Sequence, residues 1–551
     1  MSILAVIPAR GQSKGIPRKN LRLLGGFPLI YYSIRTALAS SHISTVVVSS
    51  EDDEILALAK KFGAIPLRRP TELSGDFVTL DPVIIDAANR MAESSQQDFE
   101  LVVTMQPTSP LLSVETLDQA IEQMLTREDV DTMLSVQNDP HLSWKTDENG
   151  KYVPNYVERL NRQQLPAEFR ETGSFLITRS RCIAQGKRLG NEIDLFEISS
   201  RQEAIDIDTF EDWNLCEYLL RRKHILFVVS GYHDIGLGHA YNTVLIANDI
   251  LDHQISFLVD NKSDLAYEYI SKRNYPVYQQ QGADILDDIT TLAPDIIIND
   301  CLNTDADYMR GLRSKGFVTI NFEDLGEGAK LADVVVNAMY PENEVYDNHF
   351  YGPSYFCVRD EFIFSDKRKE VRQDVQQVLL TFGGVDPENL TFKVLSSIYS
   401  YCQKNSIAIR AVLGLGYRKK QSLEAFEDVE IHQDVSNISD LMVDADIAFT
   451  SAGRTTFEVA SLGIPTIVLC QNERETTHFF ADAQNGFINF GLGKNVTNEQ
   501  ILSTFTALLD DQSRRAYMRS LMLNNDLATG KKRVVDIIKR TIRKNDVDRS
   551  F

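Results

Sequence analysis

The sequence predicts an α/β protein, with one α/β domain followed by two Rossmann-like domains that face a cleft. Apolar runs alternate with helical patterns along all 551 residues, which is typical of largely parallel sheets with helices between the strands. One opening, an apolar strand followed by a glycine-bearing loop and a helix, occurs at "SILAVIPARGQSKG" and again at "HILFVVSGYHDIGLGHAYN". The second copy of this opening indicates that a new domain begins there.

The first domain is predicted to span residues 1–223. Its expected strands are apolar runs of strand length at residues 3–7, 45–49, 101–105, 132–136, 174–177 and 204–207. Its expected helices lie near residues 28–40, 52–62, 82–92, 114–125 and 209–220. The charged "RRK" that follows the last helix marks the boundary, at about residues 222–224.

Two further domains are predicted at residues 224–370 and 371–551. Strands of the second domain are expected near residues 225–229, 255–259, 295–298, 318–321 and 334–337. The polar stretch "SDKRKEVRQDVQQ" is expected to be a connector or a helix. The third domain opens at "VLLTFGGVDPENLT", with strands near residues 407–413, 447–450 and 466–469.

Composition and charge exclude several classes of protein. With 43% hydrophobic and 25% charged residues, the chain is neither disordered nor collagen-like. No apolar stretch approaches the roughly 18–20 residues that span a bilayer, and the N-terminus leads directly into a strand, so we expect a cytoplasmic protein. The net charge of -21 repels nucleic acid, so an anionic ligand must be held by local donors. The six cysteines form no CxxC pair, which favours reduced thiols over zinc ligands or disulfides.

The first glycine-bearing loop, "ARGQSKGIPRKN", is a candidate phosphate site. Gly11 and Gly15 allow the backbone to approach a ligand closely, and Arg10, Lys14 and Lys19 supply cationic donors. A loop between the carboxyl end of a strand and a helix is where open α/β sheets bind ligands. The loop is not a Walker A motif, because GxxxxGK[ST] is absent. The alternative is a solvated basic turn.

A pair of acidic residues in "EAIDIDTFEDW" is a candidate metal site. If this stretch is a strand, Asp206 and Asp208 share one face, and two carboxylates on one face repel unless a cation lies between them. A hard divalent ion such as Mg²⁺, shared with substrate phosphates, fits these oxygen donors. Alternatively, Asp208 merely caps the following helix.

Six motifs follow one another over roughly residues 2–220, namely "IPARGQSKGIPRKNL", "VVVSSEDDEILALAKKFGA", "RRPTELSGD", "QPTSPLL", "RQQLPAEFRETGSFLI" and "EAIDIDTFED". In this order they resemble the motifs of the CMP-sialic acid synthetases, cytidylyltransferases that activate sialic, legionaminic or pseudaminic acid. The resemblance implies a Rossmann-like nucleotidyltransferase domain that converts CTP and a nonulosonic acid into a CMP-sugar and pyrophosphate. It also implies a homodimer, in which an arm of one subunit reaches the site of its neighbour.

The resemblance implies a role for each matching residue. CTP would be held by Arg10, Gly11, Ser13, Lys14, Lys19, Asn20, Arg69 and Ser74. Lys19 and Arg10 would neutralise charge near the reaction centre, and Mg²⁺ would be held by Asp206 and Asp208. The sugar acid would be bound by Gln106, Thr108, Ser109, Lys145, Arg162 and Arg170, of which Lys145 and Arg162 lie in the arm.

A second site is expected after residue 224. Gly236 and Gly238 allow close backbone approach, and His239 would stand at a helix N-terminus, where the dipole favours the neutral imidazole of a general base. Further candidates are Gly383 and Gly384, as a diphosphate cradle, and Ser451, Gly453, Thr455 and Glu458, with Glu458 accepting from ribose hydroxyls. The alternatives are a capping histidine and a surface glutamate.

Residues 224–545 resemble GT-B proteins that use UDP-sugars, and most nearly the UDP-sugar hydrolase of pseudaminic acid synthesis. His239 matches the position of the histidine that serves that hydrolase as base, whereas Asn242 stands where GxGHxxR has arginine. Three interpretations of this half stay open: a UDP-sugar hydrolase, a glycosyltransferase with another acceptor, or a non-catalytic binding or assembly module. The first would make the chain a bifunctional enzyme of nonulosonic acid synthesis.

Overall fold

The computed structural model describes residues 2–13, 15–75, 77–233, 235–342, 345–365, 370–433, 435 and 437–548. The chain divides into two compact units, the N-terminal unit Met1–Arg222 and the C-terminal unit Lys223–Phe551. Among the described residues, no helix combines the length and apolar character needed to cross a membrane. All six cysteines are free thiols, and five of them are buried.

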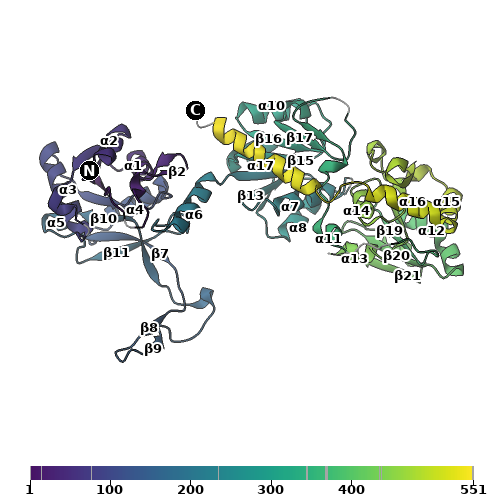
Figure 1. The fold of residues 1–551 in the computed structure, drawn as a ribbon, viewed down its shortest axis with the longest axis horizontal. Coiled ribbons are helices and arrows are strands. Elements are labelled where there is room, and N and C mark those ends of the chain that lie inside the picture. Colours follow the sequence, from purple (N-terminus) through teal and green to yellow (C-terminus); the bar gives the residue numbers. More distant parts are fainter. Residues whose placement is uncertain are drawn as a thin grey trace. The chain divides into compact units, whose positions relative to one another are not determined.

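The N-terminal unit is built on a seven-stranded sheet in the order β11-β7-β10-β6-β1-β4-β5 (Figure 1). Strand β10 runs antiparallel to β6 and β7, and the other pairings are parallel. The strands are β1 Ile3–Pro8, β4 Thr45–Ser50, β5 Ile65–Arg68, β6 Leu101–Met105, β7 Thr132–Asn138, β10 Phe169–Arg179 and β11 Ile193–Glu197. Parallel pairing of β1 with β4 and β6 brings the carboxyl ends of these strands to one edge of the sheet.

Helices cover both faces of this sheet because β1 is apolar on both sides. Ile3, Ala5 and Ile7 pack in one core cluster with residues of α1, α2 and α4, whereas Leu4 and Val6 pack with residues of α3. The helices are α1 Leu29–Ala39, α2 Asp53–Lys61, α3 Leu80–Ser95, α4 Val114–Thr126, α5 Ser180–Ala184 and α6 Phe210–Arg221. A short 3₁₀ turn, η1 Lys19–Leu21, follows the first glycine-bearing loop.

An arm leaves the sheet between β7 and β10. It carries the two-stranded β8 Trp144–Thr146 and β9 Tyr152–Pro154, which Figure 1 shows away from the sheet of this unit. The arm exposes large apolar side chains to solvent, namely Trp144, Tyr152 and Val157.

The C-terminal unit has two lobes, each an α/β layer around a parallel sheet. The first-lobe sheet has the order β14-β13-β12-β15-β16-β17-β18, and the second-lobe sheet β21-β20-β19-β22-β23-β24. The first-lobe strands are β12 His224–Val229, β13 Gln254–Val259, β14 Val277–Gln279, β15 Ile296–Asp300, β16 Val318–Phe322, β17 Val334–Asn337 and β18 His349–Tyr351. Those of the second lobe are β19 Gln377–Thr381, β20 Ala408–Leu413, β21 Val429–Gln433, β22 Ile447–Thr450, β23 Thr466–Cys470 and β24 Phe487–Leu492.

The helices of the first lobe are α7 Gly238–Ala247, α8 Asp264–Ser271, α9 Ile285–Leu292 and α10 Ala306–Ser314, and α11 Asp360–Ile363 follows the last strand. The second lobe has α12 Leu390–Lys404, α13 Ile438–Met442, α14 Thr455–Leu462, α15 Asn498–Asp510 and α16 Gln512–Leu523. The last helix, α17 Gly530–Asp548, returns to the first lobe, where Val534 and Ile538 join the core around β12 (Figure 1). Two Rossmann-like lobes with a returning final helix confirm the predicted GT-B-like fold.

One predicted strand is wrong. Residues 204–207 form no strand, and the chain from 201 to 208 runs as turns and extended backbone into α6. Ile207 N donates to Thr108 O at 2.8 Å, which ties the segment to the loop after β6. The apolar Ile205 and Ile207 pack in a small cluster with Trp213 and Cys216 of α6, so the pattern reflects local packing against a helix.

Candidate active sites

The first glycine-bearing loop follows β1, and two side chains fix its conformation through hydrogen bonds to its backbone groups. Gly11 N donates to Glu51 Oε1 at 2.7 Å, and Asn20 Nδ2 donates to the carbonyl oxygen of Arg10 at 3.0 Å. Ser13 is partly buried in the same loop. Lys14, a predicted CTP ligand, lies outside the described residues.

The loop and the acidic segment, almost 190 residues apart in sequence, meet at one place. Lys19 Nζ donates to Ile207 O at 2.5 Å and lies 3.3 Å from Asp208 Oδ1. A Cβ on Gly15 would lie 2.5 Å from the carbonyl oxygen of Asp208, so only glycine allows this approach. The two segments therefore form one site, with a buried lysine between them.

Asp206 contributes a half-buried carboxyl to this site. Burial raises its pKa, and the charge of Asp208 raises it further, whereas the charge of Lys19 lowers it. Asp206 Oδ1, Thr108 Oγ1 and Ser109 Oγ are buried and make no hydrogen bond with the described residues. A buried carboxylate oxygen without a donor is costly unless a cation offsets its charge.

Asp208 does not cap α6, which was the alternative interpretation. The N-cap is Thr209, whose hydroxyl accepts from Asp212 N while Asp212 accepts from Thr209 N. Asp212 also accepts from Asp208 N at 3.1 Å, which fixes the backbone and leaves the Asp208 side chain 76% exposed.

Arg69 is the first residue after β5, and its side chain contacts the end of β4. Its guanidinium is buried, with Nη2 donating to Ser49 O at 2.6 Å and Nε to Ser49 Oγ at 3.3 Å. Burial lowers the pKa of Arg69, and the neighbouring charge of Glu51 opposes that shift. Ser74 lies further along this segment, where its hydroxyl donates to Pro70 O at 2.9 Å.

The predicted sugar-acid residues divide into two groups. Gln106, Thr108 and Ser109 follow β6, and a Cβ on Gly173 would lie 3.1 Å from Gln106 Nε2 and 3.5 Å from Asp206 Oδ2. Thus the Gln106 amide and the Asp206 carboxyl flank one glycine of β10.

The remaining three basic residues lie away from that group. Lys145 pairs with Val153 in the arm, and Arg162 Nη2 donates to Asp139 Oδ1 at 2.6 Å. Arg170 is exposed on β10, opposite Gln137. Within a single chain, these side chains are not brought to Lys19 and Asp208.

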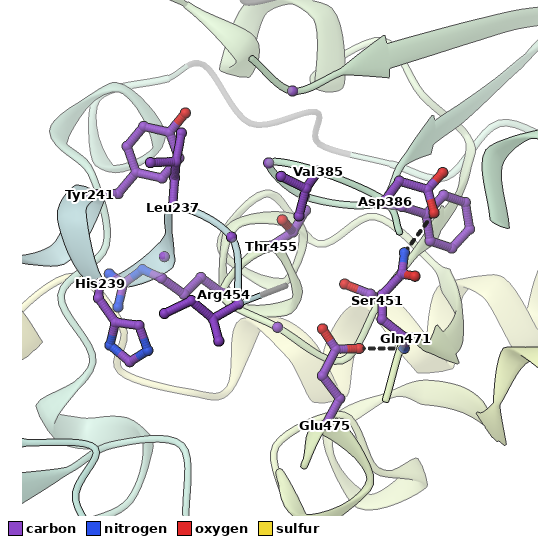
Figure 2. Close-up of a pocket in the computed structure, with 18 of the residues that line it drawn as sticks. Leu237, His239, Tyr241, Val385, Asp386, Ser451, Arg454, Thr455, Gln471 and Glu475 are labelled. Atoms are coloured by element: carbon purple, nitrogen blue, oxygen red, sulfur yellow. Dashed lines mark hydrogen bonds between the residues drawn. The ribbon is translucent and has the colours of Figure 1, made fainter. Parts of the chain in front are cut away.

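The C-terminal unit encloses a cavity of about 650 Å³ between its lobes. Figure 2 shows His239 and Leu237 of the first lobe on one side, and Asp386, Ser451, Gln471 and Glu475 of the second lobe on the other. All nine residues predicted for the second site line this cavity: Gly236, Gly238, His239, Gly383, Gly384, Ser451, Gly453, Thr455 and Glu458.

His239 belongs to a hydrogen-bonded trio in this cavity. Its Nδ1 lies 2.5 Å from Asp300 Oδ1, and Asn242 Nδ2 donates to Asp300 Oδ2 at 2.7 Å. The Asp300 carboxylate is only 1% exposed, so a proton on His239 Nδ1 offsets its charge. With Nδ1 as the donor, Nε2 is the nitrogen left as an acceptor, which is the tautomer that a general base needs.

The glycine loops approach one another at the cavity, and a buried aspartate separates the second loop from the next helix. Gly384 packs on Leu237, and Gly236 packs on Val385. Helix α12 begins only at Leu390, and its first amides are satisfied by Asp386, which accepts from Leu390 N and Thr391 N. The glycines are therefore not followed by a free helix N-terminus, because a buried aspartate occupies that position.

The N-terminus of α14 lacks a side-chain cap, although Thr456 N and Phe457 N donate to Gly453 O and Arg454 O. Its N-cap, Arg454, makes no side-chain cap bond, and Ser451, Gly453 and Thr455 surround this end. Glu458 is paired with Arg359 at 3.0 Å, so the surface-residue alternative is wrong. Burial raises the pKa of Glu475, which lies beside Gly453, to about 7.

Asp300 and Glu323 of the cavity were not found from the sequence, whereas His478, in "THFF", was expected near the nucleotide segment. Asp300 ends the apolar run "IIIND", and a carboxylate at the carboxyl end of a parallel strand was the available signal. Glu323 follows β16 with a φ of 50°, accepts from Ala338 N and Met339 N, and has its pKa raised by burial and by Asp300 to about 8. His478 donates from Nδ1 to Ala452 O, and burial lowers its pKa to about 4.

Comparisons with known proteins agree with the N-terminal geometry. A family model described as cytidylyltransferase matches residues 4–223. The CMP-N,N'-diacetyllegionaminic acid synthase of Legionella pneumophila is 34% identical over 230 residues, which are 40% of this chain and 97% of that protein. The pseudaminic acid cytidylyltransferase of Campylobacter jejuni is 30% identical over 229 residues, 41% of this chain and 98% of the relative.

A solved structure aligns with the larger part of the chain. The MurG of Acinetobacter baumannii covers 58% of this chain and 99% of its own, with 15% identity and a TM-score of 0.43. The two sequence relatives above are covered almost completely at 30% identity or more. Through its N-terminal unit, the chain therefore belongs to the cytidylyltransferase family.

Proposed function

We propose that the N-terminal unit transfers the cytidylyl group of CTP to a nonulosonic acid of the sialic, legionaminic or pseudaminic type. The observation that carries the proposal is the contact of Lys19 with Ile207 O and Asp208, which joins the glycine-bearing loop to the acidic segment. The names of the Legionella and Campylobacter relatives support this class of substrate.

In the proposed reaction, the anomeric hydroxyl of the sugar acid attacks the α-phosphate of CTP in line, and pyrophosphate leaves. Lys19 and Arg10 offset the charge that develops on the phosphate oxygens, and we expect the loop amides after Gly11, whose own N–H is used on Glu51, to donate to them. Gln106, Thr108 and Ser109 orient the acceptor next to Asp206. Positioning and charge neutralisation thus account for the catalysis.

Mg²⁺ is the proposed cofactor, held by Asp206 and Asp208. When bound, it supplies positive charge between the two carboxylates and the nucleotide phosphates. Its support is the buried, unbonded Oδ1 of Asp206 and the raised pKa of that carboxyl.

We also propose a homodimer in which the arm carries Lys145 and Arg162 to the partner's sugar-acid site. The apolar surface of Trp144, at 58% exposed, and Tyr152, at 77% exposed, supports an arm that is covered by another subunit. Sedimentation of the purified chain should give twice the monomer mass, and a monomer at micromolar concentration would contradict the dimer.

The test of the first activity is CTP turnover with Mg²⁺ against a panel of sialic, legionaminic and pseudaminic acids, followed by pyrophosphate release. We expect one acid to be used well and the others poorly. Absence of turnover with all three, in protein that binds CTP, would overturn the proposed substrate class.

A second function is favoured by the His239–Asp300 pair. We propose that the C-terminal unit hydrolyses a UDP-sugar, with His239 Nε2 taking the proton of the attacking water. The N-terminus of α14, which no side chain caps, supports binding of the diphosphate, since helix N-termini favour anions.

Incubation with candidate UDP-sugars separates the three interpretations of this unit. Release of UDP in water, lost in His239→Asn with CMP-sugar formation intact, is the expected result for a hydrolase. Release that requires an added acceptor would instead indicate a glycosyltransferase. No release in either case, with UDP-sugar binding retained, would indicate a binding module.

A further inference from the structure

Glu51 lies between the two segments that flank the proposed CTP site, and its position follows from the sheet. β4 pairs in parallel with β1 on one side, Pro8 opposite Ser49, and with β5 on the other, Ser50 opposite Arg68. The residue that follows β4 therefore emerges between the first glycine-bearing loop and the segment that begins with Arg69.

Each carboxylate oxygen of Glu51 faces one of these segments. Oε1 accepts from Gly11 N at 2.7 Å, and Oε2 lies 3.6 Å from Arg69 Nη1. Oε2 is buried and accepts no hydrogen bond from the described residues, so its negative charge is offset mainly by this arginine. The Arg69 side chain is 6% exposed, and its other donors are used on Ser49.

Charge explains why a carboxylate is required at this point. Arg10 and Arg69 are close enough that Arg10 lowers the pKa of Arg69, in addition to the larger effect of burial. Two cations gathered for one polyanion repel each other before the ligand arrives. A carboxylate behind them reduces that repulsion and fixes the guanidinium plane.

We propose that Glu51 is a positioning residue for CTP, which fixes the loop backbone at Gly11 and the plane of the Arg69 guanidinium in the arrangement that receives the nucleotide. It does not touch the reacting atoms. The inference rests on the proposed function of the N-terminal unit and adds to it a residue outside the predicted ligand set.

Calorimetric titration of CTP with Mg²⁺, without sugar acid, tests this role. Glu51→Ala loses both contacts, and we expect CTP affinity to fall about 10²-fold, since a small misplacement of positioning groups costs that much. Glu51→Gln keeps an acceptor for Gly11 N but not the charge, so a loss of about tenfold is expected. Glu115→Gln, an exposed residue in the first turn of α4, is the matched control and should bind as wild type does.

A double-mutant cycle separates positioning from a merely structural role. If Glu51 acts through Arg69, Glu51→Gln in an Arg69→Ala background should have little additional effect on CTP affinity. The KM of the sugar acid and the melting temperature should stay near their wild-type values in Glu51→Gln. Full additivity, unchanged CTP affinity, or equal losses for CTP and the sugar acid would each overturn the inference.

Failure of the role proposed for Glu51 can be distinguished from failure of the proposed function. If no nonulosonic acid is turned over but CTP binding falls in the Glu51 variants, the substrate proposal fails and the role of Glu51 stands. If wild type turns over a nonulosonic acid and the CTP affinity of Glu51→Gln equals that of wild type, the role of Glu51 fails and the substrate proposal stands.

Discussion

The two candidate sites handle charge in opposite ways. In the N-terminal unit, cations gather on a loop against a carboxylate, Asp208, whose side chain is 76% exposed. In the C-terminal unit, carboxylates gather in an enclosed cavity, where Asp300 is 1% exposed and Glu323 has a raised pKa.

The contrast indicates different means of catalysis. A site open to water and rich in cations suits a triphosphate, because the high negative charge of that ligand dominates its attraction to the site. A cavity that desolvates its titratable groups separates their pKa values, which is how acid and base roles are set at neutral pH. The two units are therefore expected to respond to different mutations and to different ranges of pH.

The largest expected effect is that of Lys19→Ala. This change removes the cation between the loop and Asp208, and CMP-sugar formation should fall about 10²–10³-fold, as for loss of a preorganised charge-stabilising donor. Pyrophosphate release measures the loss, and UDP release by the C-terminal unit should be unchanged. Lys60→Ala, at an exposed position in the last turn of α2, is the control. A folded Lys19→Ala protein with wild-type turnover would contradict the proposed site.

Next in size is the effect of Asp300→Asn on UDP release. The amide no longer fixes the proton on His239 Nδ1, so the imidazole loses its orientation as a base, and the rate should fall about 10²-fold. Binding of UDP, measured by calorimetry, should change little. If the rate of UDP release is retained, Asp300 has no part in the chemistry.

Glu323→Gln tests whether ionisation of Glu323 in the cavity destabilises the fold. Burial raises the pKa of Glu323 from its ordinary 4.5 to about 8. In the pH window between these two values, the folded state therefore binds a proton that the unfolded state lacks. Stability should therefore decrease as pH rises through the window, by at most about 1.4 kcal/mol per pH unit. Glutamine cannot ionise, so the slope should shrink.

The difference in slope between wild type and Glu323→Gln, measured by denaturant-induced unfolding between pH 7 and 8, isolates the contribution of Glu323. Glu475, with a pKa raised to about 7, also makes the fold less stable as pH rises at lower pH. His478, with a pKa lowered to about 4, has the opposite effect and makes the fold more stable as pH rises to 6.5. Glu327→Gln, at an exposed position, is the control. An unchanged slope in Glu323→Gln would show that this carboxyl is ionised in the folded protein.

The most local effect is expected for Gly15→Ala. The added methyl group would lie 2.5 Å from Asp208 O, so the loop must shift away from the acidic segment, at a cost of about 1–3 kcal/mol. We expect a higher KM for CTP with a nearly unchanged melting temperature of the C-terminal unit. Wild-type kinetics would mean that the loop adapts without losing its contact with the acidic segment.

Much of the molecule could be predicted from the sequence because its signals are local. Buried parallel strands are continuous apolar runs, so β1, β12 and β15 stand out, and glycine loops after such strands mark the edges where ligands bind. Asp206 and Asp208 were found by their spacing, yet the strand assigned to them was wrong, since the same alternation arises where Ile205 and Ile207 pack against α6.

The sequence by itself determined the order of the elements, the two glycine-loop openings and the residue types that each loop offers. Only the tertiary structure decided that Lys19 meets Asp208, that Glu51 lies between Gly11 and Arg69, and that Asp300 orients His239. These contacts join segments as much as 189 residues apart, as with Lys19 and Asp208, and follow from strand order and register. Periodicity shows which face of an element is buried, but not which other element will cover it.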